Sequence, residues 1–180
     1  MRESSKAALC GIISALAVVT MLSTYLSPFL VYAAPAFSGL LLLLILNEID
    51  YKWATGTYIT ISLVSVFTVA DKEAAVFFTM FFGFYPILGH LLNKKIRNLY
   101  LRTIIKFVCF NISCLLSFLI CMYVLGLDSE EITGGGAVFT AVFAVLMNIL
   151  FLAYDILISR LQELYTKKLQ KKFRKLFNIK

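Results

Sequence analysis

Six long apolar segments follow one another through this chain, and they constrain its fold more than any other feature. Each contains 18 to 25 residues, and roughly 20 helical residues cross a hydrocarbon core of about 30 Å. The apolar runs are continuous rather than alternating, which favours helices over barrel strands, because a helix satisfies its backbone groups internally. The segments are Ala7–Leu26, Phe29–Leu46, Trp53–Ala70, Ala74–Leu92, Thr103–Leu127 and Ala137–Ile158.

The composition excludes a small soluble domain. Of the 180 residues, 61% are hydrophobic and 15% are charged, and the mean hydropathy is +0.88. A soluble core of this size cannot bury that much apolar surface. We therefore expect an all-α fold: a polytopic membrane bundle of about six transmembrane helices over residues 1–158, followed by a basic amphipathic helix over 159–180. Because five further apolar segments follow the first, we interpret the first as a span rather than a signal peptide.

The basic residues predict the orientation. With the N-terminus inside, the inner stretches 2–6, 47–52, 93–106 and 159–180 hold 16 of the 17 Lys and Arg residues. The remaining one, Lys72, lies between Asp71 and Glu73. Cytoplasmic loops carry the excess of basic residues, so we predict a multi-pass protein of the cell membrane with both termini in the cytoplasm.

The second segment allows two interpretations. Pro28 and Pro35 bracket its first turns, and proline inside a helix removes a donor and clashes with the preceding turn. We favour a kinked span. The alternative is a re-entrant loop over 27–35 followed by a short helix, which is tolerated only where protein or a cavity covers its backbone.

Motifs for cofactor chemistry are absent from the sequence. The four cysteines lie in apolar stretches without a CxxC pair, and none neighbours His90, the single histidine. We therefore expect no metal, no cofactor and no redox site. There is no phosphate-cradling glycine loop, so any ATP-driven process needs another subunit. The four cysteines are Cys10, Cys109, Cys114 and Cys121.

The last 22 residues keep a helical period outside the apolar segments. An apolar stripe runs beside many basic residues from Leu161 to Phe177. Such a helix lies along the headgroups and is attracted to anionic lipid. We expect a membrane anchor that contacts anionic lipid and no nucleic acid; a docking helix for a cytosolic partner is the alternative.

Small residues line one face of the first segment. Ala7, Gly11 and Ala15 recur every four residues, a spacing that lets a second helix approach closely. This face serves either internal packing or contact with a separate membrane subunit.

Two features of the spans predict a bend in one helix and an ion pair between two others. Gly83 and Pro86 indicate a bend in the fourth segment, whose freed carbonyls need partners. Lys106 and Asp155 lie at similar shallow depth on antiparallel segments, and a lone charge in a span is costly. We therefore predict a Lys106–Asp155 pair that acts as a structural clasp; an ion- or proton-coupling site is the less favoured interpretation.

Polar residues near the outer side suggest a pocket that opens outward. Hydroxyl residues form one face of the third segment, a charged connection follows it, and tyrosines near the interface with an asparagine complete the set. Interfacial tyrosines usually anchor the helix at the headgroups, which is the alternative role for the tyrosines of this set. The predicted ligand-binding residues are Thr57, Ser65, Asp71, Lys72, Tyr85 and Asn111.

The pattern resembles the substrate-binding S components of energy-coupling factor (ECF) transporters. The stretch from Lys6 to Ala15, KAALCGIISA, is similar to the small-residue motif of their first helix, with Gly11 where an alanine is expected. The segments DKEAA at Asp71 and FNIS at Phe110 are also similar to uncharacterised membrane proteins of Gram-positive bacteria.

The resemblance implies a substrate-capture subunit without ATPase activity. A small molecule would bind in an outward-facing pocket beneath the loops near 27–35, 71–73 and 128–136. A transmembrane coupling subunit would contact Ala7, Gly11 and Ala15, and separate ATPase subunits would drive release inward.

Two other classes compete with this interpretation. A non-enzymatic scaffold or assembly protein would recruit partners or anionic lipid through the basic tail. A lipid-modifying enzyme would need an acid–base pair at headgroup depth, for which Glu48, His90 and Asp155 are the inner-side candidates; we do not expect an enzyme.

Overall fold

The computed structural model describes residues 3–27, 29–126 and 136–169, and in these ranges the chain forms helices without any strand. The expected all-α fold is therefore observed. The predicted outer loop over 128–136, except Gly136, and the end of the predicted tail, 170–180, lie outside the described residues. The elements are α1 (Glu3–Leu22), η1 (Ser23–Leu26), α2 (Leu30–Glu48), α3 (Tyr51–Thr68), α4 (Lys72–Phe77), η2 (Phe78–Phe82), α5 (Phe84–Lys95), α6 (Leu99–Tyr123), α8 (Gly136–Leu164) and η3 (Tyr165–Leu169).

Five helices in the described part of the chain are long and apolar enough to cross a membrane. They are Glu3–Leu26, Leu30–Glu48, Lys72–Lys95, Leu99–Tyr123 and Val138–Lys167. Helix α3 has 18 residues, or about 27 Å of helix, but it is not among the five. The difference from the expected six crossings comes from its many hydroxyl side chains, which lower its hydropathy.

The hydroxyls of α3 are largely satisfied within the helix. Thr55, Thr57, Thr60 and Thr68 each donate to the carbonyl four residues earlier, at 2.8 to 3.0 Å. This local bonding removes most of the cost of placing a hydroxyl in an apolar environment. A sixth crossing at α3 therefore remains chemically reasonable and stays a proposal.

Helix α2 runs unbroken from Leu30 to Glu48 with Pro35 inside it. The re-entrant alternative, with a loop over 27–35, is therefore not what the structure contains. Pro35 is fully buried, as is Ser38 one turn later. This helix is the centre of the molecule, because α1, α3, α4, α5 and α8 all contact it.

The fourth apolar segment is one helical span with an irregular turn inside it, close to Gly83 and Pro86, where the sequence predicts a bend. Between α4 and α5, residues Phe78–Phe82 form a π-helical turn. Gly83 N–H donates to Phe78 O at 2.8 Å, five residues back. The irregularity lies just before Gly83, where the missing N–H of Pro86 already removes one helical bond.

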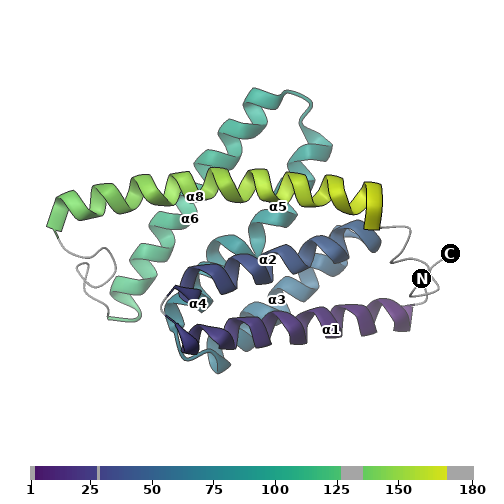
Figure 1. Cartoon of the computed structure of the whole chain (residues 1–180), viewed down its shortest axis with the longest axis horizontal. Helices are drawn as coiled ribbons and strands as arrows, with labels where there is room; N and C mark the ends of the chain where they lie inside the picture. Colours follow the sequence, from purple (N-terminus) through teal and green to yellow (C-terminus); the bar gives the residue numbers. More distant parts are fainter. Residues whose placement is uncertain (1–2, 28, 127–135, 170–180) are drawn as a thin grey trace.

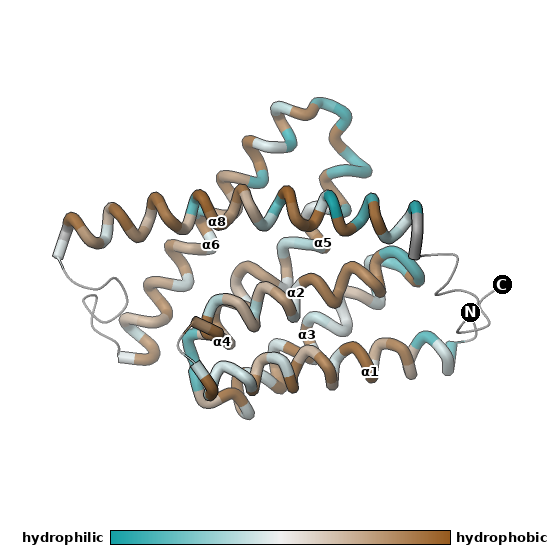
Figure 2. The backbone as a smooth tube through the Cα atoms, viewed as in Figure 1, coloured by the Kyte–Doolittle hydropathy of each residue, from teal (hydrophilic) through white to brown (hydrophobic). Residues whose placement is uncertain are grey.

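The long helices form a bundle, with the first and the last described residues at one end of it. Figure 1 shows α1, α2 and α3 side by side, with α8 running in nearly the same direction as α1 and α6 crossing α8 obliquely. The start of α1 and the end of α8 lie at the same end of the molecule. In Figure 2 hydrophilic residues gather at the helix ends and in the α5–α6 connection, whereas the middles of the helices are hydrophobic.

An aromatic cluster joins η2 and α5 to α6 and α8. Phe81 has rings from three other elements within 6.2 Å of its centroid, those of Tyr85, Phe110, Phe151 and Tyr154. Phe110 and Phe151 stack at 4.6 Å. Offset and edge-on aromatic contacts of this kind favour a fixed arrangement of the helices that carry them.

Candidate functional site

The small-residue face of α1 borders a hollow between α1 and α3. The hollow has a volume of about 470 Å³. On the α1 side it is lined by Ala7, Cys10, Gly11 and Ser14, and on the α3 side by Lys52, Trp53, Gly56, Thr57 and Thr60. Of the predicted coupling face, Ala7 and Gly11 line the hollow, and Ala15 is exposed next to it.

The two glycines leave this hollow open. A Cβ added at Gly11 or at Gly56 would meet no atom within 4 Å. Small residues on both facing helices therefore create a concave surface of the kind that lets another helix approach closely. Lys6 Nζ lies 6.0 Å from the ring of Trp53 at one end of it, within the range of a cation–π contact.

The opposite face of α1 is fixed to the bundle. Ile13, Ala17 and Met21 are buried, and Ser38 of α2 donates to Ala17 O at 3.0 Å. The periodicity of α1 therefore divides it into a packed side and an open small-residue side. The open side is available to a partner without any rearrangement of the helix.

Lys106 and Asp155 form the ion pair that the sequence analysis predicts. Lys106 Nζ lies 2.6 Å from Asp155 Oδ1, and the two side chains are 7% and 25% exposed. The hydroxyl of Tyr85 donates to the same carboxylate oxygen at 2.5 Å. The pair and its tyrosine join α5, α6 and α8, so the charges are compensated where lipid would leave them unpaired.

Tyr85, which the sequence predicts to line an outward-opening pocket, is buried against Asp155 in the structure. Its side chain is 1% exposed, and its hydroxyl is held by Asp155. The position of Tyr85 along its own segment does not show which side chain of another helix it meets. Here a buried carboxylate on another helix needs a second donor.

Two tyrosines that were not predicted as site residues donate hydrogen bonds to backbone carbonyls of the π-helical turn. Tyr58 donates to Thr79 O at 2.6 Å. Tyr154 is 3.2 Å from Ala36 O and 3.4 Å from Phe82 O. Phe82 O is the carbonyl that Pro86, lacking an N–H, leaves without its helical donor. That missing donor was the only signal in the sequence for such a partner.

Gly39 allows this contact between α2 and the π turn. A Cβ at Gly39 would lie 2.2 Å from Phe82 O and 2.6 Å from the Tyr154 hydroxyl. Only a residue without a side chain lets the two backbones approach this closely. The sequence does not distinguish Gly39 from the other apolar-segment glycines.

The six predicted ligand-binding residues do not gather in one place. Thr57 lines the α1–α3 hollow. Ser65 is fully buried, and its hydroxyl has no partner among the described residues. Lys72 donates to Val66 O and Val69 O at 2.9 Å each, so it caps the end of α3. Asp71 is half-buried before α4.

Asn111 lies apart from the other five residues, on the face that α6 turns toward α8. Its amide nitrogen donates to Phe107 O and to Asn148 Oδ1. The hollow that it lines contains none of the other five predicted residues. A single outward pocket built from all six therefore does not form in the described structure.

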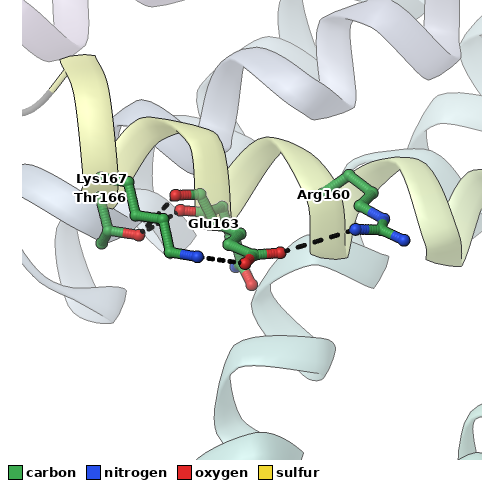
Figure 3. A network of polar contacts seen from close by, with 5 residues as sticks. Arg160, Glu163, Thr166 and Lys167 are labelled. Atoms are coloured by element: carbon green, nitrogen blue, oxygen red, sulfur yellow. Dashed lines mark hydrogen bonds and ion pairs between the residues drawn. The ribbon is translucent and has the colours of Figure 1, made fainter.

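A polar hollow of about 530 Å³ lies among α2, α5 and α8. Asn47 of α2, His90 and Lys94 of α5, and Glu163 of α8 are among its lining residues. Figure 3 shows that Glu163 is engaged along α8, by Lys167 at 2.6 Å and by Arg160 at 3.9 Å. These charges are mostly exposed, so they position one another weakly.

The three candidate residues for enzyme chemistry have different surroundings. Glu48 accepts a hydrogen bond from Tyr165 at 2.9 Å, Asp155 is held by Lys106 and Tyr85, and His90 lines the polar hollow. Among the described residues, no group of three metal-ligating side chains lies together. All four cysteines are free thiols.

Comparisons with protein-family models, with curated proteins and with solved structures gave no match to this chain.

Proposed function

We propose that this chain is the substrate-capture membrane subunit of an ECF-type uptake transporter. It binds a small molecule from outside and depends on a separate coupling subunit and on ATPase subunits. The observation that carries the proposal is the hollowed small-residue face of α1, where Ala7 and Gly11 lie open beside α3. A single transmembrane helix with small or apolar side chains fits such a surface.

The remaining features support the same assignment. Sixteen of the 17 basic residues fall in connections on one side, and the described ends of the bundle lie together. We therefore place both termini in the cytoplasm of a cell-membrane protein. The open face of α1 then extends from the cytoplasmic end of its helix, within reach of a subunit that also contacts cytosolic ATPases.

The proposal is tested by the substitution Gly11→Leu with native co-purification. Because a side chain at Gly11 meets nothing within 4 Å, the variant is expected to fold while its bulk fills the hollow. The coupling and ATPase subunits that accompany the unmodified protein should be lost. The matched control is Ala8→Leu, an exposed neighbour outside the hollow, which should retain them. If Gly11→Leu retains its partners, this face is not the coupling surface.

The scaffold alternative depends on the basic tail over 159–180, half of which lies outside the described residues. The described part of that tail packs against the bundle, since Tyr165 is buried and donates to Glu48. Deletion of residues 170–180 separates the two functions. The transporter proposal expects retained co-purification with the coupling subunit, and the scaffold alternative expects loss of partners.

A further inference from the structure

A second hollow lies between α6 and α8, away from the α1–α3 hollow. It has a volume of about 280 Å³. Its walls are apolar and aromatic, and include Phe110, Phe118, Phe143 and Met147. Figure 1 shows the two helices crossing obliquely. The exposed side chains of Leu115 and Ala144 also line it, so the hollow opens sideways from the bundle.

Two asparagines form the polar part of this hollow. Asn111 Nδ2 donates to Asn148 Oδ1 at 3.2 Å, and Asn148 Nδ2 donates back to Asn111 Oδ1 at 3.4 Å. Each amide nitrogen also donates to its own helix, at Phe107 O and Ala144 O respectively. Every N–H of the two side chains is therefore used.

The amide oxygens are only half used. A carboxamide oxygen accepts two hydrogen bonds, and each of these oxygens accepts one, from the other asparagine. A group that completes the pair must therefore donate a hydrogen bond rather than accept one. A ligand hydroxyl meets this requirement, whereas a ketone, an ester or an ether does not.

The depth of the pair determines where the ligand comes from. Asn111 lies at the middle of α6 and Asn148 near the middle of α8. Both helices are long and apolar enough to cross a membrane, which places the pair near the bilayer centre. Water does not supply the missing donors there. A molecule that reaches this opening from the side arrives through the lipid and must be apolar itself.

We propose that the α6–α8 hollow binds a lipophilic alcohol that enters from the bilayer. The apolar chain lies between Phe110, Phe118 and Phe143, and the hydroxyl donates to Asn111 Oδ1 or Asn148 Oδ1. This site is separate from the α1–α3 hollow and does not depend on the transporter assignment. Its failure therefore leaves the partner-binding proposal untouched.

Photolabelling of the protein in lipid nanodiscs tests the site. The probe is a long-chain primary alcohol with a diazirine in its chain, and the comparison compound is its methyl ether, which cannot donate. The alcohol should label α6 and α8 residues of the hollow saturably, with competition by dodecan-1-ol. The ether should label them about threefold less, the factor expected for one interhelical-type hydrogen bond in a membrane. Peptide mass spectrometry locates the labels.

Two sets of variants make the result decisive. Ala144→Leu fills the hollow and should abolish the saturable labelling, whereas Ala141→Leu, an exposed alanine of α8 outside the hollow, should leave it unchanged. The double variant Asn111→Leu with Asn148→Leu should remove the preference for alcohol over ether. Equal labelling by the two compounds in the unmodified protein, or equal effects of the two alanine variants, would overturn the proposal.

Discussion

The centre of the bundle and its last two long helices are held together by different means. In an apolar 18-residue stretch of each span, 44% of the stretch is buried inside the molecule in α2 and in the span from Lys72 to Lys95. The corresponding share is 22% in α6 and 17% in the span from Val138 to Lys167. The central helices meet through close backbone approach, at Gly39 and Phe82. The two peripheral helices are attached through the aromatic cluster around Phe81 and through hydrogen bonds and an ion pair between polar side chains.

This difference indicates what each region contributes. In lipid, apolar surface gains little from facing protein rather than hydrocarbon, so packing of small residues and interhelical hydrogen bonds decide where a helix lies. The central helices are held by close packing at a small residue, Gly39. Helix α8 depends on Tyr154, Asp155 and Tyr165, whose bonds reach α2, α5 and α6. We expect substitutions at these bonds to detach α8 before they disturb α1, α2 and α3.

The largest effect is expected from Asp155→Leu. This substitution leaves Lys106 buried without its partner, which costs about 3 kcal/mol or more of unfolding free energy. Unfolding in mixed micelles of increasing SDS content measures the change. The double variant Lys106→Met with Asp155→Leu removes both charges and should recover most of the loss. A single variant as stable as the unmodified protein would contradict the clasp interpretation.

A smaller effect, about 2 kcal/mol, is expected from Gly39→Ala. The added Cβ would lie 2.2 Å from Phe82 O, and a backbone cannot move aside as a flexible side chain does. The control is Gly56→Ala, where the Cβ meets nothing within 4 Å and alanine favours the helix. The same SDS titration separates them. Equal stability of the two variants would show that the central contact tolerates separation.

The sequence predicts the helices of this chain better than it predicts their contacts. Apolar length and proline positions place most ends of the long helices to within four residues, although α8 continues to Leu164, six residues beyond the predicted Ile158. The shallow depth of Lys106 and Asp155 on antiparallel segments is enough to pair them. The proposed ligand pocket fails for a geometric reason. Helical periodicity gives the face on which Thr57 or Asn111 lies, but it does not say which helix that face meets.

The residues that sequence reasoning missed act on backbone atoms. Phe82 O lacks its helical donor because Pro86, four residues later, has no N–H. Gly39 leaves room for this carbonyl, and Tyr154 donates a hydrogen bond to it. The proline predicts that a donor is needed, but any of nine tyrosines or many hydroxyls could supply it. Only the three-dimensional arrangement identifies Tyr154.

A third effect, about 1 kcal/mol, is expected from Tyr154→Phe. Loss of the hydroxyl leaves Phe82 O without this donor while the ring packing stays. Tyr123→Phe is the control, because that side chain is 81% exposed. Hydrogen exchange of α8 amides should rise in the first variant and not in the second. Unchanged exchange in both would mean that the hydroxyl contributes nothing to the attachment of α8.

The smallest effect is expected from Glu163→Gln. The carboxylate bonds only exposed cations of its own helix, so the melting temperature should not change measurably. Thermal unfolding followed by circular dichroism provides the check. A clear decrease would show that the C-terminal end of α8 depends on this network as well as on Tyr165.

The central claim, that the α1–α3 hollow receives a helix of a partner subunit, is tested most directly by cross-linking in native membranes. An encoded diazirine side chain is placed at Thr60, on the rim of the hollow, or at Leu63, which is 59% exposed on the same helix and does not line it. The account predicts a discrete product from position 60 with one membrane protein that co-purifies with ATPase subunits. This product should be absent from position 63 and abolished by Gly11→Leu. The same products from both positions, or a product that persists with Gly11→Leu, would contradict it.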